Sequence, residues 1–236
     1  MKIKAVLFDR DGTLTDFDST WGPAIAEVLR ELAGDDAGAL ATLEEMSLFS
    51  VEQKRFTGPS LLKVQAPADY SARWAQVLGE PDPTAMLERI EATLLRHCGT
   101  NVTPFDGVVE TLNGLVRAGL PIGLATNGTE ASARRQMEIL GLGDAFTFLA
   151  GYDSGHGRKP EPGQLLAFAR HVGFDPGEIA MVGDSLHDMH AAEAAGMIRI
   201  AVTTGAVSRA ELEPAADHVF DSMHPLLALA TGELAA

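Results

Sequence analysis

The sequence predicts an α/β protein with a Rossmann-like parallel sheet at its core and a helical domain inserted early in the chain. Short apolar segments of strand character alternate with stretches of helical character, the pattern of a parallel sheet covered by helices. The first two strand segments are separated by more than 100 residues, far beyond an ordinary crossover. We therefore expect a core domain of residues 1–17 and 101–236, and an inserted domain of residues 18–100.

The core strands are expected at five short, continuous apolar runs: residues 4–8, 121–125, 146–150, 179–182 and 198–202. The inserted domain is predicted to be helical rather than stranded, with helices at residues 23–32, 37–48, 68–78 and 83–97. Residues 106–117 are expected to form the first helix back in the core. Three of the core strands end at candidate catalytic residues, and open α/β sheets bind ligands at the carboxyl ends of their strands.

Composition narrows the function classes. The 236 residues are 46% hydrophobic and 22% charged, without an apolar run near the roughly 20 residues that span a membrane. The formal net charge of −15 disfavours non-specific nucleic-acid binding, which depends on Lys and Arg. Cys98 is the single cysteine, and the N-terminal apolar run lacks a cleavage site, so we expect a cytoplasmic protein.

The most informative segment is VLFDRDGTLTD at residues 6–16, an apolar run that ends in Asp9 and Asp11. If the strand ends at Asp9, a turn at Gly12 can bring Asp11 back toward the same pocket. Two carboxylates at a strand end favour a cation. Asp9 could be both nucleophile and metal ligand, while Asp11 could donate and accept protons.

Three later segments fit the same site. LPIGLATNGT places Thr126 and Asn127 between a strand and a helix, where a hydroxyl and backbone N–H groups suit a phosphate. GHGRKPEPG brings Lys159 close to a helix start, where it can offset carboxylate repulsion and phosphoryl charge. The same loop carries His156 between two glycines, as a candidate substrate contact.

The fourth segment, IAMVGDSLHDMHAAEAAGM, ends a strand at Asp184 and begins a helix near Asp188. Acidic residues are favoured at a helix N-terminus by its dipole. These two carboxylates could supply the oxygen ligands that Mg²⁺ prefers.

The four segments, in this order, resemble the motifs of the haloacid dehalogenase superfamily, and within it the phosphoglycolate phosphatase branch. The resemblance implies a Mg²⁺-dependent phosphatase of small phosphorylated metabolites, with residues 18–100 as a helical cap. It implies an aspartyl-phosphate on Asp9, acid–base catalysis by Asp11, and phosphoryl contacts from Thr126 and Lys159. The implied metal ligands are Asp9, the backbone carbonyl of Asp11, Asp184 and Asp188; Asn127 and His156 are implied as further substrate contacts.

One residue departs from the common pattern: Arg10 lies between the two aspartates, where many members carry an apolar residue. An arginine there resembles the histidinol-phosphate and sugar-phosphate phosphatases, which often hold zinc through several cysteines. With Cys98 alone, that zinc site is not expected.

Alternatives remain open at this stage. A phosphomutase similar to the β-phosphoglucomutases uses the same core, although the first histidine here is His97, late in the inserted domain. A dehalogenase needs no partner at Asp11 and no Mg²⁺, and a non-catalytic phosphate-binding protein would not need the full set of charged residues. Candidate specificity residues are Trp21, Lys54 and Arg55. The chain is expected to be a monomer or a homodimer.

Overall fold

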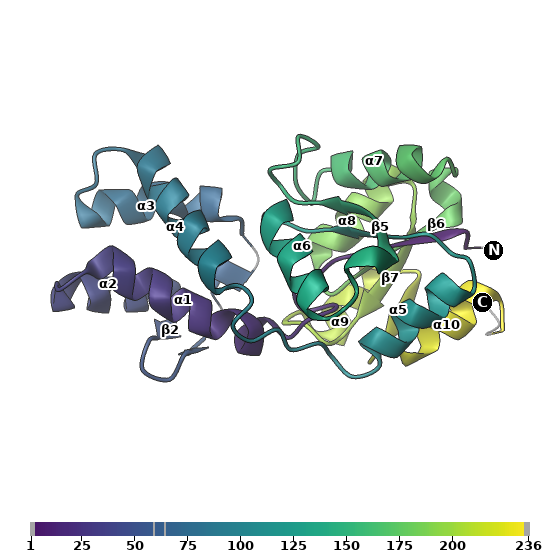
Figure 1. Ribbon diagram of the computed structural model, residues 1–236. Coiled ribbons are helices and arrows are strands. Elements are labelled where there is room, and N and C mark those ends of the chain that lie inside the picture. Colours follow the sequence, from purple (N-terminus) through teal and green to yellow (C-terminus); the bar gives the residue numbers. More distant parts are fainter. Residues whose placement is uncertain (1–2, 59, 64, 234–236) are drawn as a thin grey trace. The chain divides into compact units, whose positions relative to one another are not determined.

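The computed structural model describes residues 3–58, 60–63 and 65–233 and contains a six-stranded parallel sheet (Figure 1). The strand order is β5-β4-β1-β6-β7-β8, and every neighbouring pair is parallel. The strands are β1 (Ala5–Phe8), β4 (Ile122–Ala125), β5 (Phe146–Ala150), β6 (Ile179–Gly183), β7 (Ile198–Val202) and β8 (His218–Phe220). The predicted α/β class with a parallel sheet is confirmed.

Helices cover both faces of this sheet. Alternate side chains of β1 point to opposite faces, so Val6 and Phe8 join one apolar cluster while Ala5 and Leu7 join another. The first cluster includes residues of α5 (Val108–Arg117), α6 (Glu130–Ile139) and α10 (His224–Thr231). The second includes residues of α7 (Gly163–Val172) and α8 (Leu186–Ala195). Because β1 is buried on both faces, it reads as a continuous apolar run.

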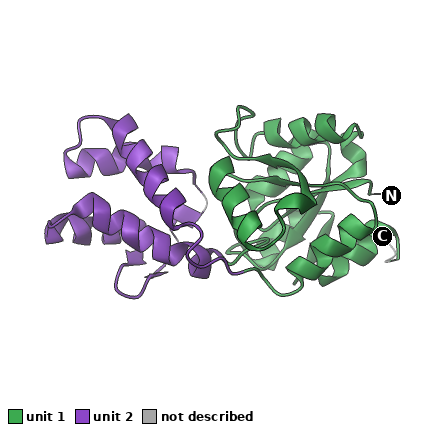
Figure 2. Ribbon diagram, in the orientation of Figure 1, with its two compact units in different colours: residues 1–16, 104–236 green, residues 17–103 purple. Residues whose placement is uncertain are grey.

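The chain forms two compact units (Figure 2). The core unit consists of residues 1–16 and 104–236, and the inserted unit of residues 17–103. The inserted unit contains α1 (Phe17–Ala33), α2 (Ala37–Ser47), β2 (Phe49–Ser50), β3 (Arg55–Phe56), α3 (Pro67–Leu78) and α4 (Pro83–His97). It has its own apolar core, in which Trp21 is only 6% exposed. Trp21 therefore packs inside this unit, and its role in substrate choice stays a prediction.

Helix α1 begins six residues before its predicted start at Pro23. A proline inside a helix leaves the carbonyl four residues earlier without its usual donor. Here that carbonyl belongs to Ser19, and the side-chain amide of Asn101 donates to it at 2.7 Å. A contact from 82 residues away thus lets the helix run through Pro23.

Three short strands also differ from the sequence prediction. The inserted unit contains the antiparallel β2–β3 pair as well as helices, with Phe49 opposite Phe56. The edge strand β8 was not predicted either. These strands have two or three residues each, too few to show an alternating pattern. Among the described residues, there is no helix that combines the length and the apolar character needed to cross a membrane.

Candidate active site

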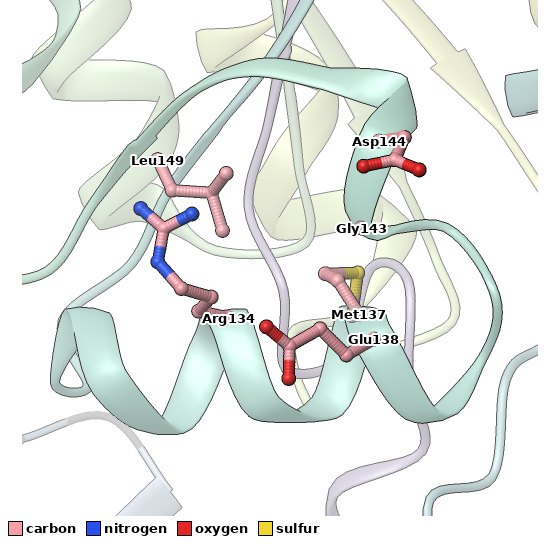
Figure 3. A pocket seen from close by; sticks show the side chains of 6 residues that line it. All are labelled: Arg134, Met137, Glu138, Gly143, Asp144 and Leu149. Carbon is pink, nitrogen blue, oxygen red and sulfur yellow. The ribbon is translucent and has the colours of Figure 1, made fainter.

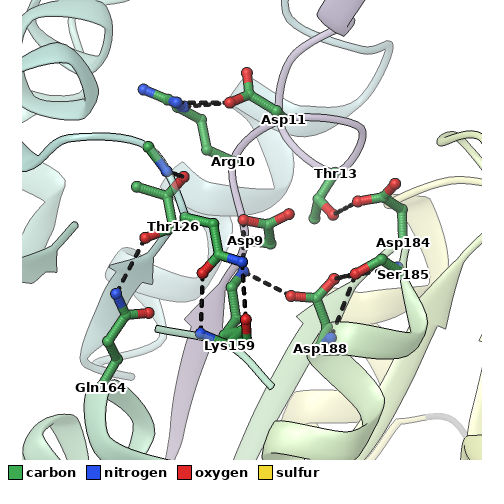
Figure 4. Close-up of polar contacts among 12 residues, drawn as sticks. Asp9, Arg10, Asp11, Thr13, Thr126, Lys159, Gln164, Asp184, Ser185 and Asp188 are labelled. Carbon is green, nitrogen blue, oxygen red and sulfur yellow. Dashed lines mark hydrogen bonds and ion pairs between the residues drawn. The ribbon is translucent and has the colours of Figure 1, made fainter. Parts of the chain in front are cut away.

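The ends of three adjacent central strands bring the predicted motifs together (Figure 4). Asp9 follows β1, Thr126 follows β4 and Asp184 follows β6, and β1 lies between the other two strands. The backbone N–H of Asp9 donates to the Val182 carbonyl of β6 at 2.9 Å. The pairing with β6 therefore extends to Asp9 and fixes the position of its backbone. Thr13 Oγ1 donates to Asp184 Oδ1 at 2.9 Å, so two residues 171 positions apart in the sequence share one site.

Three buried carboxylates form the centre of the site. Asp9, Asp184 and Asp188 each offer an oxygen atom, and these atoms lie within 4.8 Å of one another, a spacing that could hold a metal ion. Burial raises the pKa of Asp9 to about 7, against the attraction of Lys159. Burial, with repulsion from Asp9 and Asp188, also raises the pKa of Asp184 well above its usual range. Grouped acids of this kind are stable as anions only beside cations.

Lys159 is the cation in direct contact with this group. Its Nζ lies 2.7 Å from Asp9 Oδ1 and 2.6 Å from Asp188 Oδ1, and the residue is only 4% exposed. Burial alone would lower the pKa of Lys159, but attraction and hydrogen bonds from Asp188 and Asp9 outweigh burial and raise it. The lysine is therefore charged and immobilised between the two aspartates.

Asp188 lies in the first turn of α8, where the sequence predicted it. Ser185 caps this helix and donates to Asp188 Oδ2 from both its hydroxyl at 2.6 Å and its backbone N–H at 3.1 Å. Lys159 takes the other oxygen, Oδ1. Asp188 thus anchors Lys159 as well as belonging to the carboxylate group, a role that the sequence alone did not reveal.

The side chain of Asn127 forms hydrogen bonds with the backbone of Lys159. Its amide nitrogen donates to the Lys159 carbonyl, and its amide oxygen accepts from the Lys159 N–H, both at 2.9 Å. The side chain predicted to bind substrate is therefore engaged in holding the neighbouring loop. Gln164 adds a second link that sequence reasoning missed, because its amide nitrogen donates to the Thr126 carbonyl at 3.0 Å. Thr126 Oγ1 accepts from the Gly128 N–H at 3.0 Å, which orients the hydroxyl.

Two glycines allow the backbone to approach Asp184 closely. Gly12 has φ +86°, and a Cβ there would lie 2.3 Å from Asp184 Oδ2. A Cβ on Gly205, in the loop after β7, would lie 1.7 Å from the same oxygen. Thr204 Oγ1 also donates to the Gly12 carbonyl at 2.6 Å. The turn at Gly12 was predicted from the sequence, whereas the contribution of Gly205 was not.

Among the described residues, the carboxylate of Asp11 is not part of the three-carboxylate group. Its Oδ2 accepts two hydrogen bonds from the neighbouring Arg10, from Nε at 2.9 Å and from Nη2 at 2.6 Å. Thr15 Oγ1 lies 3.4 Å from the other oxygen. Asp11 is thus close to Asp9 in sequence but is held by a guanidinium rather than by Lys159 (Figure 4).

His156 lies elsewhere in the core unit. Its ring stacks on Phe148 of β5, with centroids 6.3 Å apart, and no described contact joins it to the carboxylates. Its role as a substrate contact is not tested by this ring contact and stays a prediction.

A small cavity lies away from these residues, beside α6 and β5 (Figure 3). Its volume is about 100 Å³, and it is lined by Arg134, Met137, Glu138, Gly143, Asp144 and Leu149. Small-molecule sites are usually several hundred Å³. This cavity is therefore too small to enclose a metabolite.

Comparison with known proteins agrees with this arrangement. The family of haloacid dehalogenase-like hydrolases matches residues 3–196, which include all four motifs. The chain belongs to this family. The motifs in the sequence resembled those of this family, and the prediction of the family is confirmed.

Relatives within this family carry more specific names. A phosphoglycolate phosphatase of Rhodospirillum rubrum is 34% identical over 208 residues, covering 86% of this chain and 80% of that protein. An N-acetylmuramic acid 6-phosphate phosphatase of Pseudomonas aeruginosa is 30% identical over 205 residues, covering 87% and 84%. The solved structure of a predicted phosphatase from Clostridium acetobutylicum has a TM-score of 0.70 at 21% identity, covering 99% and 100%. This last likeness concerns the fold alone.

Proposed function

We propose that this chain is a Mg²⁺-dependent phosphatase of small phosphorylated metabolites, of the phosphoglycolate or sugar phosphate class. The observation that carries the proposal is the buried pair of Asp9 and Lys159 at 2.7 Å, at the end of the central strand β1. A carboxylate held beside a fixed ammonium group can attack phosphorus while the ammonium group offsets charge on the phosphoryl oxygens. The named relatives, which are phosphatases of an acid and of a sugar derivative, support this class of substrate.

The donor set fits a divalent cation. Oxygen ligands from carboxylates are those that Mg²⁺ prefers. Four carboxylates of the site accompany two cationic side chains: Asp9, Asp11, Asp184 and Asp188 with Lys159 and Arg10. The four negative charges of the carboxylates exceed the two positive charges by two, which matches the charge of a divalent cation. Asp9 and Asp184 would hold it, with Asp188 beside them and the Asp11 backbone carbonyl as a further ligand. When bound, Mg²⁺ would neutralise charge on the carboxylates and on the phosphoryl group.

The reaction proceeds in two displacements. Asp9 uses a carboxylate oxygen to attack phosphorus in line, the bond from phosphorus to the leaving oxygen breaks, and Asp11 gives that oxygen a proton. Asp11 then takes a proton from a water molecule that attacks the aspartyl-phosphate, which returns Asp9 as a carboxylate and releases inorganic phosphate. Thr126 and Lys159 bind the non-reacting oxygens and stabilise their charge during both displacements.

Discrimination among metabolites is proposed to depend on the inserted unit, as a cap. Lys54 and Arg55 are exposed there, so both are available to an anionic substrate. Substituting either by alanine should alter the ranking of natural metabolites more than the hydrolysis of 4-nitrophenyl phosphate, which has little for a cap to recognise. Equal losses on both kinds of substrate would contradict this role.

The proposal is tested by assaying a panel of phosphorylated metabolites with Mg²⁺, measuring phosphate release and isomer formation together. We expect phosphate release, with Asp9→Asn inactive because an amide is not nucleophilic. Asp11→Asn should lose about 10²–10⁴ in rate, since it keeps the nucleophile but removes proton transfer. Isomer formation without phosphate release would instead indicate a phosphomutase. Normal turnover by homogeneous Asp9→Asn would overturn the covalent mechanism.

A further inference from the structure

Arg10 is a buried arginine that lies just after β1, between Asp9 and Asp11. It is 1% exposed and is among the largest fully buried side chains of the described residues. Burying a guanidinium is costly unless its charge and its donors are satisfied. Its neighbours in the chain, Asp9 and Asp11, are the two acids to which the proposed mechanism gives chemical roles.

The contacts of Arg10 join two separate motifs. Nε and Nη2 donate to Asp11 Oδ2 at 2.9 and 2.6 Å, while Nη1 donates to Ser132 Oγ at 2.9 Å. Ser132 lies in the first turn of α6, immediately after the loop that contains Thr126, and its own hydroxyl donates to the Thr129 carbonyl at 2.9 Å. The guanidinium therefore connects Asp11 to a fixed point of the helix that follows the second motif.

The second motif also makes room for this side chain. A Cβ on Gly128 would lie 2.3 Å from Arg10 Nη2, so a larger residue at that position would displace the guanidinium. Gly128 donates its N–H to Thr126 Oγ1, so the loop that orients the Thr126 hydroxyl is the loop that accommodates Arg10. Ser132 therefore accepts a hydrogen bond from the guanidinium, and the lack of a side chain at Gly128 leaves room for it.

Asp11 needs such a partner. Its carboxylate and that of Asp9 lie on either side of Arg10 in the chain, and like charges so close together repel each other. A free aspartate side chain would turn away from the three-carboxylate group and sample several rotamers. Arg10 opposes this by fixing Oδ2 through two donors, a geometry that a planar guanidinium provides and an ammonium group does not.

We propose that Arg10 is a positioning residue that holds the carboxyl group of Asp11 in place for proton transfer to the leaving oxygen. This rests on the proposed phosphatase function. In the step concerned, the Asp11 O–H bond breaks and its proton joins the leaving oxygen, which keeps the electron pair of the breaking P–O bond. Arg10 touches neither substrate nor phosphorus and acts through Asp11.

The test uses two substrates that differ in their need for a proton. 4-Nitrophenolate leaves readily without one, whereas the more basic phenolate of phenyl phosphate needs the acid. The full-length protein with Mg²⁺ is mixed rapidly with each substrate, and the first release of the phenol is measured for the wild type, Arg10→Leu, Asp11→Asn and the double variant. Arg10→Leu should slow phenyl phosphate about 10- to 100-fold and 4-nitrophenyl phosphate by less than about threefold.

The double variant decides whether Arg10 acts through Asp11. If it does, adding Arg10→Leu to Asp11→Asn should slow phenyl phosphate by less than about a further threefold. A further loss as large as in the wild type would overturn the proposal, as would equal losses on the two substrates. The proposed function fails separately, if Asp9→Asn releases either phenol at the wild-type rate.

Milder variants keep the test valid if Arg10→Leu does not fold. Arg10→Lys retains the charge but not the two donors to Asp11 Oδ2. Ser132→Ala removes the acceptor of Arg10 Nη1 on α6, together with the hydrogen bond from its own hydroxyl to the Thr129 carbonyl. Both variants should favour 4-nitrophenyl phosphate over phenyl phosphate, less strongly than Arg10→Leu. The matched control is Arg134→Leu, also on α6, whose half-exposed guanidinium pairs with Glu130. It should leave both rates unchanged. If both milder variants keep the wild-type ratio of rates, the positioning role is wrong.

Discussion

The side-chain amide of Asn127 forms two hydrogen bonds of 2.9 Å with the backbone of Lys159, one as donor and one as acceptor. The two residues belong to loops that follow different strands, 32 positions apart in the sequence. Because Lys159 also contacts Asp9 and Asp188, this amide fixes the distance between the β4 loop and the ammonium group at the centre of the site.

Replacing Asn127 by alanine should lower kcat by about tenfold, since a small displacement of a charged group weakens the stabilisation of the transition state. It should also lower the free energy of unfolding by about 1–3 kcal/mol, because partners of the amide lose their hydrogen bonds. Steady-state kinetics and denaturant titration measure both. Asn101→Ala is the control: its amide also donates to a backbone carbonyl, but in the inserted unit, so kcat should not change.

Lys159→Met should destabilise the protein at neutral pH, because it removes the cation in contact with two buried carboxylates. We expect a loss of about 3–5 kcal/mol in the free energy of unfolding, measured without added metal. Lys4→Met offers a matched comparison, since Lys4 pairs with Glu178 at 2.6 Å but both side chains are more than one third exposed. That exposed pair should be worth less than about 1 kcal/mol. Similar losses in both variants would mean that burial of the Lys159 pairs contributes nothing.

Asp184→Asn should raise the Mg²⁺ concentration for half-maximal activity by at least about tenfold, because a neutral amide is a weaker ligand than a carboxylate. Excess chelator should abolish wild-type activity. Thr13→Val is the comparison variant: it removes the hydrogen bond to Asp184 Oδ1 and keeps the charge, so the Mg²⁺ requirement should rise less. Full activity in chelator would refute the metal assignment.

The pH dependence of stability should contain a contribution from Asp217, which lies just before the edge strand β8. A side-chain hydrogen bond from Arg199 of β7 lowers the pKa of Asp217 below its usual value. A lowered pKa stabilises the folded state above the unfolded pKa of about 3.9, and this contribution is lost as the pH falls through the folded value. The wild type should therefore exceed Asp217→Asn in stability at neutral pH, and the difference should vanish in acid. Arg199→Met should weaken the same pH dependence, because the backbone N–H of residue 199 still donates to Asp217 after the side-chain donors are lost. An unchanged curve in either variant would contradict the pairing.

The sequence by itself determined the fold class, the family and the position of most of the central residues. Strands such as β1 and β6 are buried on both faces, so their apolar runs are continuous and can be read locally. Parallel strands place their carboxyl ends at one edge of the sheet, and for that reason Asp9 and Asp184 could be assigned to one site before any distance was known.

Only the tertiary structure decided which side chains contact one another at that edge. A sequence motif does not specify side-chain rotamers. The hydrogen bonds of Asn127 with Lys159, and those of Arg10 with Asp11 and Ser132, therefore became known only from the packing of separate loops. The same holds for Trp21 and His156, whose residue types suggested substrate contacts. The ring of Trp21 packs in the apolar core of the inserted unit, and that of His156 stacks on Phe148. Residue type alone did not reveal these contacts, because burial of an aromatic side chain depends also on segments distant in sequence.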